Sequence, residues 1–123
     1  MNKRLTLLMA ITLPVFTSVS VAGGDAARGQ QLYESRCVAC HSVTENRVGP
    51  ASQGVFGRRA GRVLGYEYSG ALKSSKIIWS EKTLNAWLTN PERLIPGQKM
   101  GYMVTEAGDR ADLIGYLRQI SPP

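Results

Sequence analysis

The chain has 123 residues, of which 43% are hydrophobic and 20% charged, and its formal net charge is +6. This length fits one globular domain and is too short for two. The basic excess is concentrated between Arg47 and Lys76, where six basic residues accompany a single acidic one. Such a segment can attract an acidic protein surface or a bound anionic ligand. Aromatic residues do not alternate with the basic ones as on a nucleic-acid-binding platform, so we expect no nucleic-acid partner.

The first 22 residues have the organisation of an export signal. A basic segment, Asn2–Arg4, precedes the apolar stretch Leu5–Val15, and small residues ending at Ala22 form a cleavage site. The apolar stretch is shorter than the roughly 20 residues that span a bilayer, and Pro14 interrupts it. We therefore expect cleavage after Ala22, which leaves a periplasmic domain, residues 23–123, without stable membrane insertion. An uncleaved membrane anchor is the alternative.

The first predicted element of this domain is a helix from about Ala26 to Arg36. Asp25 is a suitable N-cap, because its carboxylate can accept the free N–H groups of the first turn. Four residues fall on one helical face: Gly29, Leu32, Tyr33 and Cys37. The next segment, residues 42–75, shows no sustained hydrophobic period and contains six glycines, so it is predicted to be loop.

Two further helices are predicted in the second half of the chain. Ser80 can cap a helix with Glu81 in its first turn, and this helix should stop before Pro91, since the residue before a proline disfavours the helical conformation. Asp109 is expected to cap the last helix. The apolar stripe of this last helix consists of Leu113, Ile114, Leu117 and Ile120, with Tyr116 beside it. No segment has the pattern of a paired strand, so the predicted fold class is all-α.

Three short helices make a small core for a domain of this size. A loop of more than 30 residues is also unusual in a compact domain unless something orders it. A bulky buried cofactor would answer both difficulties by acting as the missing core.

One short motif holds both cysteines and the only histidine of the chain: Cys37, Cys40 and His41, in the order Cys-x-x-Cys-His. A Cys37–Cys40 disulfide would constrain little of the chain, and a thioredoxin-like pair would require neighbouring strands. A structural zinc site needs four ligands, and only three are present. The pattern is that of covalent haem attachment, in which two thiols form thioethers and the histidine binds the iron. The haem interpretation is favoured over a disulfide or zinc site.

With His41 used, the second axial ligand of the iron cannot be another histidine. Beyond the signal, the only methionines are Met100 and Met103. Met100 follows the turn formed by Pro96 and Gly97, where its thioether can face a pocket. Met103 is expected to fill the core. His/Met ligation suits electron transfer, whereas an open iron position suits gas binding or peroxide chemistry.

Residues 24–120 resemble the class I cytochromes c, especially mitochondrial cytochrome c and its soluble bacterial relatives. The matching segments are GDAARGQQLY, CVACH, VGPASQGVFGRRAG, GYEYSGAL, IIWSEKTLNAWLTNPERLIPGQKM and DLIGYL. The resemblance implies a small cytochrome c fold, with short helices and long loops around one covalently attached haem c. It implies that Cys37 and Cys40 hold the haem and that His41 and Met100 bind its iron.

The resemblance also assigns the surroundings of the haem. Pro50 would accept the hydrogen bond of the His41 ring, a contact that fixes a ligating imidazole. Six residues are expected around the haem: Pro50, Arg58, Tyr68, Trp79, Trp87 and Tyr102. Arg58, Tyr68 and Trp79 match positions that contact the propionates, whereas Arg59 and Arg62 are expected to be surface residues. Gly29 and Tyr33 should cross the last helix at Leu113 and Tyr116.

The function implied is that of a monomeric periplasmic electron carrier, not an enzyme, working between membrane or periplasmic oxidoreductases of a respiratory chain. The alternative is a haem protein with a labile sixth ligand that acts as a peroxidase or gas sensor. A second axial ligand positioned in the PGQKM segment favours the carrier.

Overall fold

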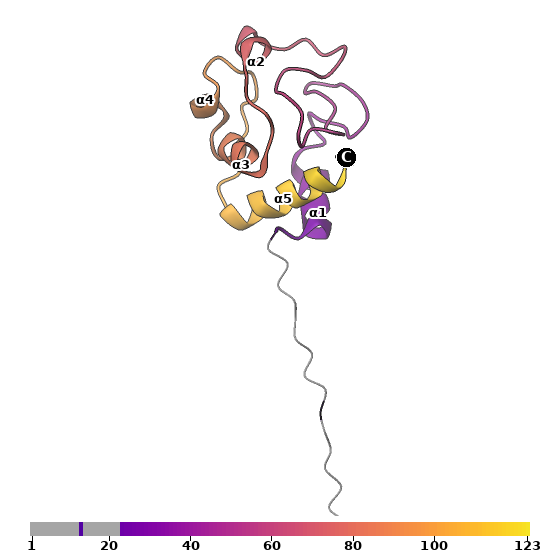
Figure 1. Ribbon diagram of the computed structural model, residues 1–123. Helices are drawn as coiled ribbons and strands as arrows, with labels where there is room; N and C mark the ends of the chain where they lie inside the picture. Colours follow the sequence, from indigo (N-terminus) through magenta and orange to yellow (C-terminus); the bar gives the residue numbers. More distant parts are fainter. Residues whose placement is uncertain (1–12, 14–22) are drawn as a thin grey trace, which may run out of the picture.

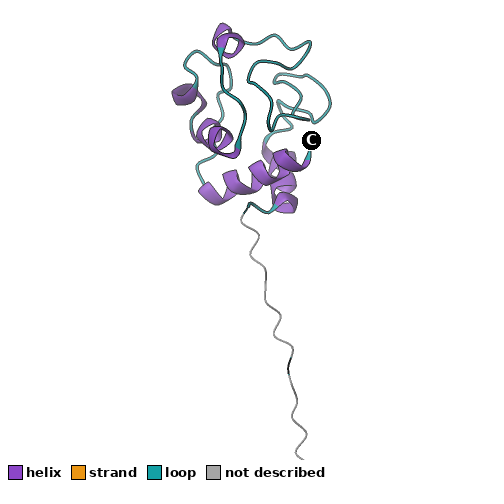
Figure 2. Ribbon diagram, viewed as in Figure 1, coloured by secondary structure: helices purple, strands orange, loops and turns teal. Residues whose placement is uncertain are grey.

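A computed structural model describes residue 13 and residues 23–123 of the chain, so most of the predicted signal, residues 1–22, lies outside the described residues. The described part contains five helices in the order α1 (Ala26–Arg36), α2 (Gly70–Ser74), α3 (Glu81–Thr89), α4 (Pro91–Leu94) and α5 (Ala107–Gln119). Figures 1 and 2 show these helices joined by long loops. The described residues form no strand beyond one isolated bridge between Arg59 and Ile78. The all-α prediction is confirmed.

Helices α1 and α3 begin where their capping residues require. Asp25 accepts hydrogen bonds from the backbone N–H groups of Ala27 and Arg28, which fixes the start of α1. Ser80 and Thr83 form a capping box at the start of α3: the side chain of each accepts the backbone N–H of the other. The helix ends at Thr89 as predicted, but the chain then enters the short helix α4, with Pro91 in its first turn. Neither α4 nor the five-residue α2 was predicted, because both are too short to show a hydrophobic period.

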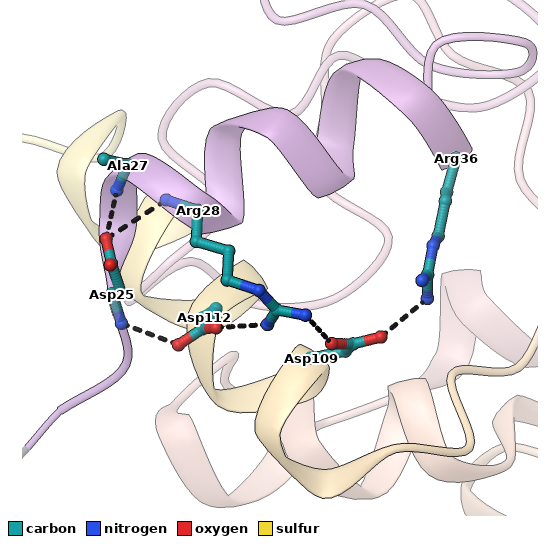
Figure 3. A network of polar contacts seen from close by, with 6 residues as sticks. All are labelled: Asp25, Ala27, Arg28, Arg36, Asp109 and Asp112. Atoms are coloured by element: carbon teal, nitrogen blue, oxygen red, sulfur yellow. Dashed lines mark hydrogen bonds and ion pairs between the residues drawn. The ribbon is translucent and has the colours of Figure 1, made fainter.

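The prediction that Asp109 caps the last helix is wrong. Helix α5 begins at Ala107, three residues earlier than a cap at Asp109 implies, with Glu106 in the capping position and no side-chain cap. Asp109 instead accepts hydrogen bonds from Arg28 at 2.6 Å and from Arg36 at 2.9 Å, both from α1 (Figure 3). Arg28 also pairs with Asp112, whose other oxygen accepts the backbone N–H of Asp25. These bonds fasten α1 to α5 near both of its ends.

The most extensive helix packing is the crossing of α1 and α5, at the lower end of the folded part in Figure 1, and it contributes one part of the buried core. The rings of Tyr33 and Tyr116 pack with their centroids 5.4 Å apart. Leu113 is almost fully buried at the same crossing, and α3 also packs against α5. The predicted crossing of Gly29 and Tyr33 on the last helix is therefore confirmed. None of the helices in the described residues is long and apolar enough to cross a membrane.

Candidate haem-binding site

A cavity of about 980 Å³ opens between the helices and the long loops. Its walls come from the turn after α1, from loop residues 46–52 and 65–69, from α3 and α5, and from residues 99–102. The structure brings all ten predicted site residues to this one cavity: Cys37, Cys40, His41, Pro50, Arg58, Tyr68, Trp79, Trp87, Met100 and Tyr102. The segment predicted to be loop thus forms part of the wall of a single cavity.

The Cys-x-x-Cys-His motif forms a hydrogen-bonded turn directly after α1. The backbone N–H of Cys40 and that of His41 both donate to the carbonyl of Cys37, at 3.1 and 2.8 Å. Cys37 is half-buried and Cys40 exposed, and neither thiol is in a disulfide. Burial raises the pKa of the Cys37 thiol to about 11. A thiol redox pair requires a lowered pKa, so this environment opposes that alternative.

The imidazole of His41 is held by the loop that follows it. Its Nδ1 lies 2.8 Å from the carbonyl oxygen of Pro50, so that Nδ1–H donates and Nε2 is left free. Gly49 packs against the face of the ring, where a β carbon would lie only 2.3 Å from a ring carbon. The Gly49 N–H in turn donates to the carbonyl of Cys40 at 2.7 Å. The motif and the loop therefore fix the imidazole in one orientation.

Met100 is partly buried against the core and lines the cavity, on a segment far from His41 in the sequence. Tyr102 also lines the cavity, with 40% of its surface exposed. The prediction that Met103 fills the core is wrong, because 54% of its surface is exposed and it does not line the cavity. Its backbone belongs to residues 98–106, which form no helix or strand, so no hydrophobic period reveals its exposure.

Aromatic residues and one guanidinium complete the cavity wall. The rings of Trp79 and Trp87 lie edge to face, 5.3 Å between centroids. The hydroxyl of Tyr68 accepts the backbone N–H of Val63. Burial lowers the pKa of Arg58, which forms no ion pair within the described residues and donates to the carbonyl of Gln53. A half-buried cation without an acidic partner suits an anionic group in the cavity.

Arg59 and Arg62, which follow Arg58 in the sequence, differ in their exposure to solvent. Arg62 is exposed, as expected for a surface residue. Arg59 is half-buried instead, because its Nε donates to the carbonyl of Ser75 at 2.9 Å and its backbone forms the bridge to Ile78. A cluster of basic residues in the sequence does not show which of its arginines is exposed.

Comparison with known proteins decides the family. The sequence profile of cytochrome c matches residues 26–121. The chain is 45% identical over 100 residues to cytochrome c of Euglena viridis, which covers 79% of this chain and 98% of that protein. It is 44% identical over 102 residues to cytochrome c of Gibberella zeae, covering 80% of this chain and 96% of that one. The chain belongs to the cytochrome c family.

A solved structure agrees with this assignment. Cytochrome cH from Methylobacterium extorquens superimposes with a TM-score of 0.74 at 39% identity, covering 78% of this chain and 99% of that chain. As a member of the cytochrome c family, the chain carries one covalently attached haem c and is an electron-transfer protein rather than an enzyme. The predicted family, fold and cofactor are confirmed.

The cavity fits this cofactor in size and in chemistry. Pockets for ligands of a few dozen atoms measure about 300–1,000 Å³, and this cavity lies at the upper end of that range. It is lined by two thiols, one imidazole and one thioether, the groups that bind c-type haem. In the part of the chain that the structure describes, no group of three or more His, Cys, Asp or Glu side chains is placed so that it could hold a metal ion, which gives the zinc alternative no support.

The sequence did not identify two polar residues that join the loops of the cavity wall, Asn46 and Tyr66. Asn46 donates to the carbonyl of Leu64 at 2.9 Å and accepts the N–H of Ala51, and so joins the two loops that form one wall. Tyr66 donates to the carbonyl of Val48 at 2.6 Å across the same gap. Single polar residues in loops show no periodicity, so only the three-dimensional arrangement reveals them.

Proposed function

We propose that this member of the cytochrome c family is a soluble periplasmic carrier of single electrons, with His41 and Met100 as the axial ligands of its haem iron. Cys37 and Cys40 would hold the haem through thioethers. When bound, the haem supplies an iron that cycles between Fe(II) and Fe(III). One observation carries the proposal: His41 and Met100, 59 positions apart in the sequence, line the same cavity as the two thiols.

The remaining cavity residues have distinct roles in this proposal. Pro50 orients the imidazole through the hydrogen bond to Nδ1. Arg58, with Tyr68 and Trp79 nearby in the wall, would neutralise the propionates of the haem. Trp87 and other apolar side chains exclude water from the cavity, which favours a high reduction potential. A rigid site also limits the reorganisation that accompanies electron transfer.

Electrons would enter and leave at the exposed rim of the cavity. Cys40, Gly101 and Tyr102 are all exposed and all line the cavity, so the cofactor would come closest to solvent there. The family transfers electrons between redox partner proteins, and we propose that the partners here are membrane or periplasmic oxidoreductases. The basic segment between Arg47 and Lys76 would steer an acidic partner surface.

The periplasmic location rests on the export pattern of the first 22 residues. We propose that signal cleavage leaves residues 23–123 as a monomeric domain. N-terminal sequencing of protein recovered from the periplasmic fraction tests this directly. A first residue at Gly23, or within one or two positions of it, is expected. A chain that stays in the membrane fraction with its N-terminus intact would show that the segment is an anchor.

Substitution of the two methionines tests the ligand assignment. Met100→Ala should remove the weak far-red sulfur–iron band of the oxidised protein, lower the reduction potential and allow carbon monoxide to bind the reduced form. Met103→Ala is the matched control, because Met103 is exposed and does not line the cavity. A Met100→Ala variant with an unchanged band would refute the assignment. Ready carbon monoxide binding by the unmodified protein would instead favour a gas sensor or peroxidase.

A further inference from the structure

The segment that carries Met100 is attached to helix α4 by three connected hydrogen bonds. Glu92 of α4 accepts the backbone N–H of Gly97 at 2.9 Å through one carboxylate oxygen. Its other oxygen accepts the side-chain amide of Gln98 at 3.1 Å. The oxygen of the Gln98 amide in turn accepts the backbone N–H of Met100 at 2.5 Å. One surface carboxylate is thus connected, through one amide, to the backbone of Met100.

The order of donors and acceptors in this chain is determined by chemistry. An ionised carboxylate can only accept hydrogen bonds, so Gln98 must turn its NH₂ group toward Glu92. The amide oxygen is then left for the N–H of Met100. Because the carboxylate is charged, its hydrogen bonds are stronger than those between neutral groups. The orientation of Gln98 is therefore set by Glu92.

The backbone of this segment needs such support. Gly97 has a φ of +89°, a conformation that suits glycine, and with Pro96 it forms a turn closed by the bond from the Gln98 N–H to the carbonyl of Ile95 at 3.2 Å. Residues 99–103 beyond this turn belong to no helix or strand. The hydrogen bonds from Glu92 through Gln98 thus hold the backbone of a segment that has no regular secondary structure.

We infer that Glu92 and Gln98 are positioning residues for the Met100 thioether. This inference rests on the proposed function, in which Met100 binds the haem iron. Neither residue would touch the iron: Glu92 is exposed on α4, and Gln98 reaches Met100 only at its backbone N–H. Their effect is to hold the Met100 backbone in place, so that its thioether competes successfully with exogenous ligands for the iron.

The hydrogen-bond pattern permits an exchange experiment. Glu92→Gln alone leaves one acceptor oxygen for two donors, the Gly97 N–H and the Gln98 NH₂, so at least one of the three hydrogen bonds is lost in any orientation of the two amides. Gln98→Glu alone places a second carboxylate against that of Glu92, and the two negative charges repel each other. The double variant E92Q/Q98E restores all three bonds: the new amide at position 92 accepts from Gly97 and donates to position 98, and the new carboxylate there accepts from Met100. It also restores the net charge.

The measurement is the affinity of the oxidised haem protein for imidazole, together with the intensity of the sulfur–iron band. Each single variant should bind imidazole about tenfold more tightly, since it loses a hydrogen bond that involves a charged group. The exchanged double variant should return to the affinity of the unmodified protein. Gln119→Glu, an exposed position at the end of α5, is the charge-matched control for Gln98→Glu and should have no effect.

The inference is overturned if both single variants bind imidazole like the unmodified protein, or if the double variant binds as tightly as the single ones. A change in thermal stability without a change in imidazole affinity would also overturn it, because the pair would then support only the fold. Met100→Ala separates this inference from the proposed function. If that variant keeps the sulfur–iron band, the ligand assignment itself has failed.

Discussion

Gly29 on α1 lies against the backbone of Asp112 on α5 so closely that a β carbon at position 29 would fall 1.9 Å from the Asp112 carbonyl oxygen. Backbone atoms cannot move aside as a flexible side chain can, so α1 and α5 cross at this distance only because residue 29 is glycine. The crossing buries Tyr33 and Leu113, which also line the cavity.

Gly29→Ala should therefore lower the free energy of unfolding by about 3 kcal/mol, the upper part of the usual range for overpacking. Denaturant unfolding of the haem-loaded protein measures it. Gly108→Ala is the matched control, since Gly108 is in α5 and a β carbon there would have no neighbour within 4 Å. The control should gain about 0.5–1 kcal/mol, because alanine favours a helix over glycine. Equal effects of the two substitutions would contradict the close crossing.

Asp109 should make the stability of the protein depend on acidity. Its hydrogen bond from Arg28, with a further one from Arg36, holds the pKa of Asp109 below its ordinary value. A lowered pKa in the folded state contributes stability above the ordinary range, about pH 4, and this contribution is lost as the pH falls through the folded value. Asp109→Asn should consequently be less stable than the unmodified protein at pH 7, and the difference should shrink as the pH falls below about 4.

The free energies of unfolding of Asp109→Asn and of the unmodified protein are compared at pH 7, 5 and 3. Glu106→Gln is the control, because Glu106 is exposed and forms no ion pair in the described residues. It should show no comparable difference at any of these pH values. If the difference between Asp109→Asn and the unmodified protein remains the same at pH 3, the two arginines are not the source of the stability.

Gly49 should be essential for the orientation of His41. A β carbon at position 49 would lie 2.3–2.7 Å from three atoms of the imidazole, so Gly49→Ala must displace either the ring or the loop that carries Pro50. The expected result is a loss of haem-loaded protein of about tenfold, or a shifted haem spectrum in what remains. Gly70→Ala, where a β carbon would meet nothing within 4 Å and which does not line the cavity, should load haem normally. Normal loading and spectrum in Gly49→Ala would show that the ring does not need this contact.

Arg58 should raise the reduction potential. It is a half-buried cation on the cavity wall, and a positive charge favours the reduced, less positive iron. Replacement by glutamine should lower the potential by roughly 40 mV, the equivalent of about 1 kcal/mol for one electron. Arg62→Gln removes the same charge from an exposed position and should change the potential much less. A potential titration that gives equal shifts would place Arg58 outside the haem environment.

The sequence predicted the parts of the fold that depend on local chemistry. Asp25 and Ser80 were identified as caps because capping requires a short polar side chain just before a helix, and both act as caps in the structure. The site residues were predicted from a covalent attachment motif and a family resemblance. These features need only neighbouring residues or a known pattern.

The errors and omissions come from features that the local sequence pattern does not show. Asp109 has the right chemistry for a cap, but it pairs with arginines 81 and 73 positions away in the sequence. Met103 looked like a core residue but is exposed and does not line the cavity. The contact of Glu92 with Gln98 crosses a turn and follows no period. Such contacts exist only once the chain has folded.

The most direct test of the account is a reduced-minus-oxidised visible spectrum of the protein exported from cells that have haem-attachment machinery, followed by extraction with acid acetone. The account predicts sharp bands in the reduced form, a weak far-red sulfur–iron band in the oxidised form, and colour that stays with the polypeptide after extraction. Haem colour without the sulfur–iron band would contradict Met100 as the ligand. A colourless polypeptide would contradict covalent haem attachment at Cys37 and Cys40.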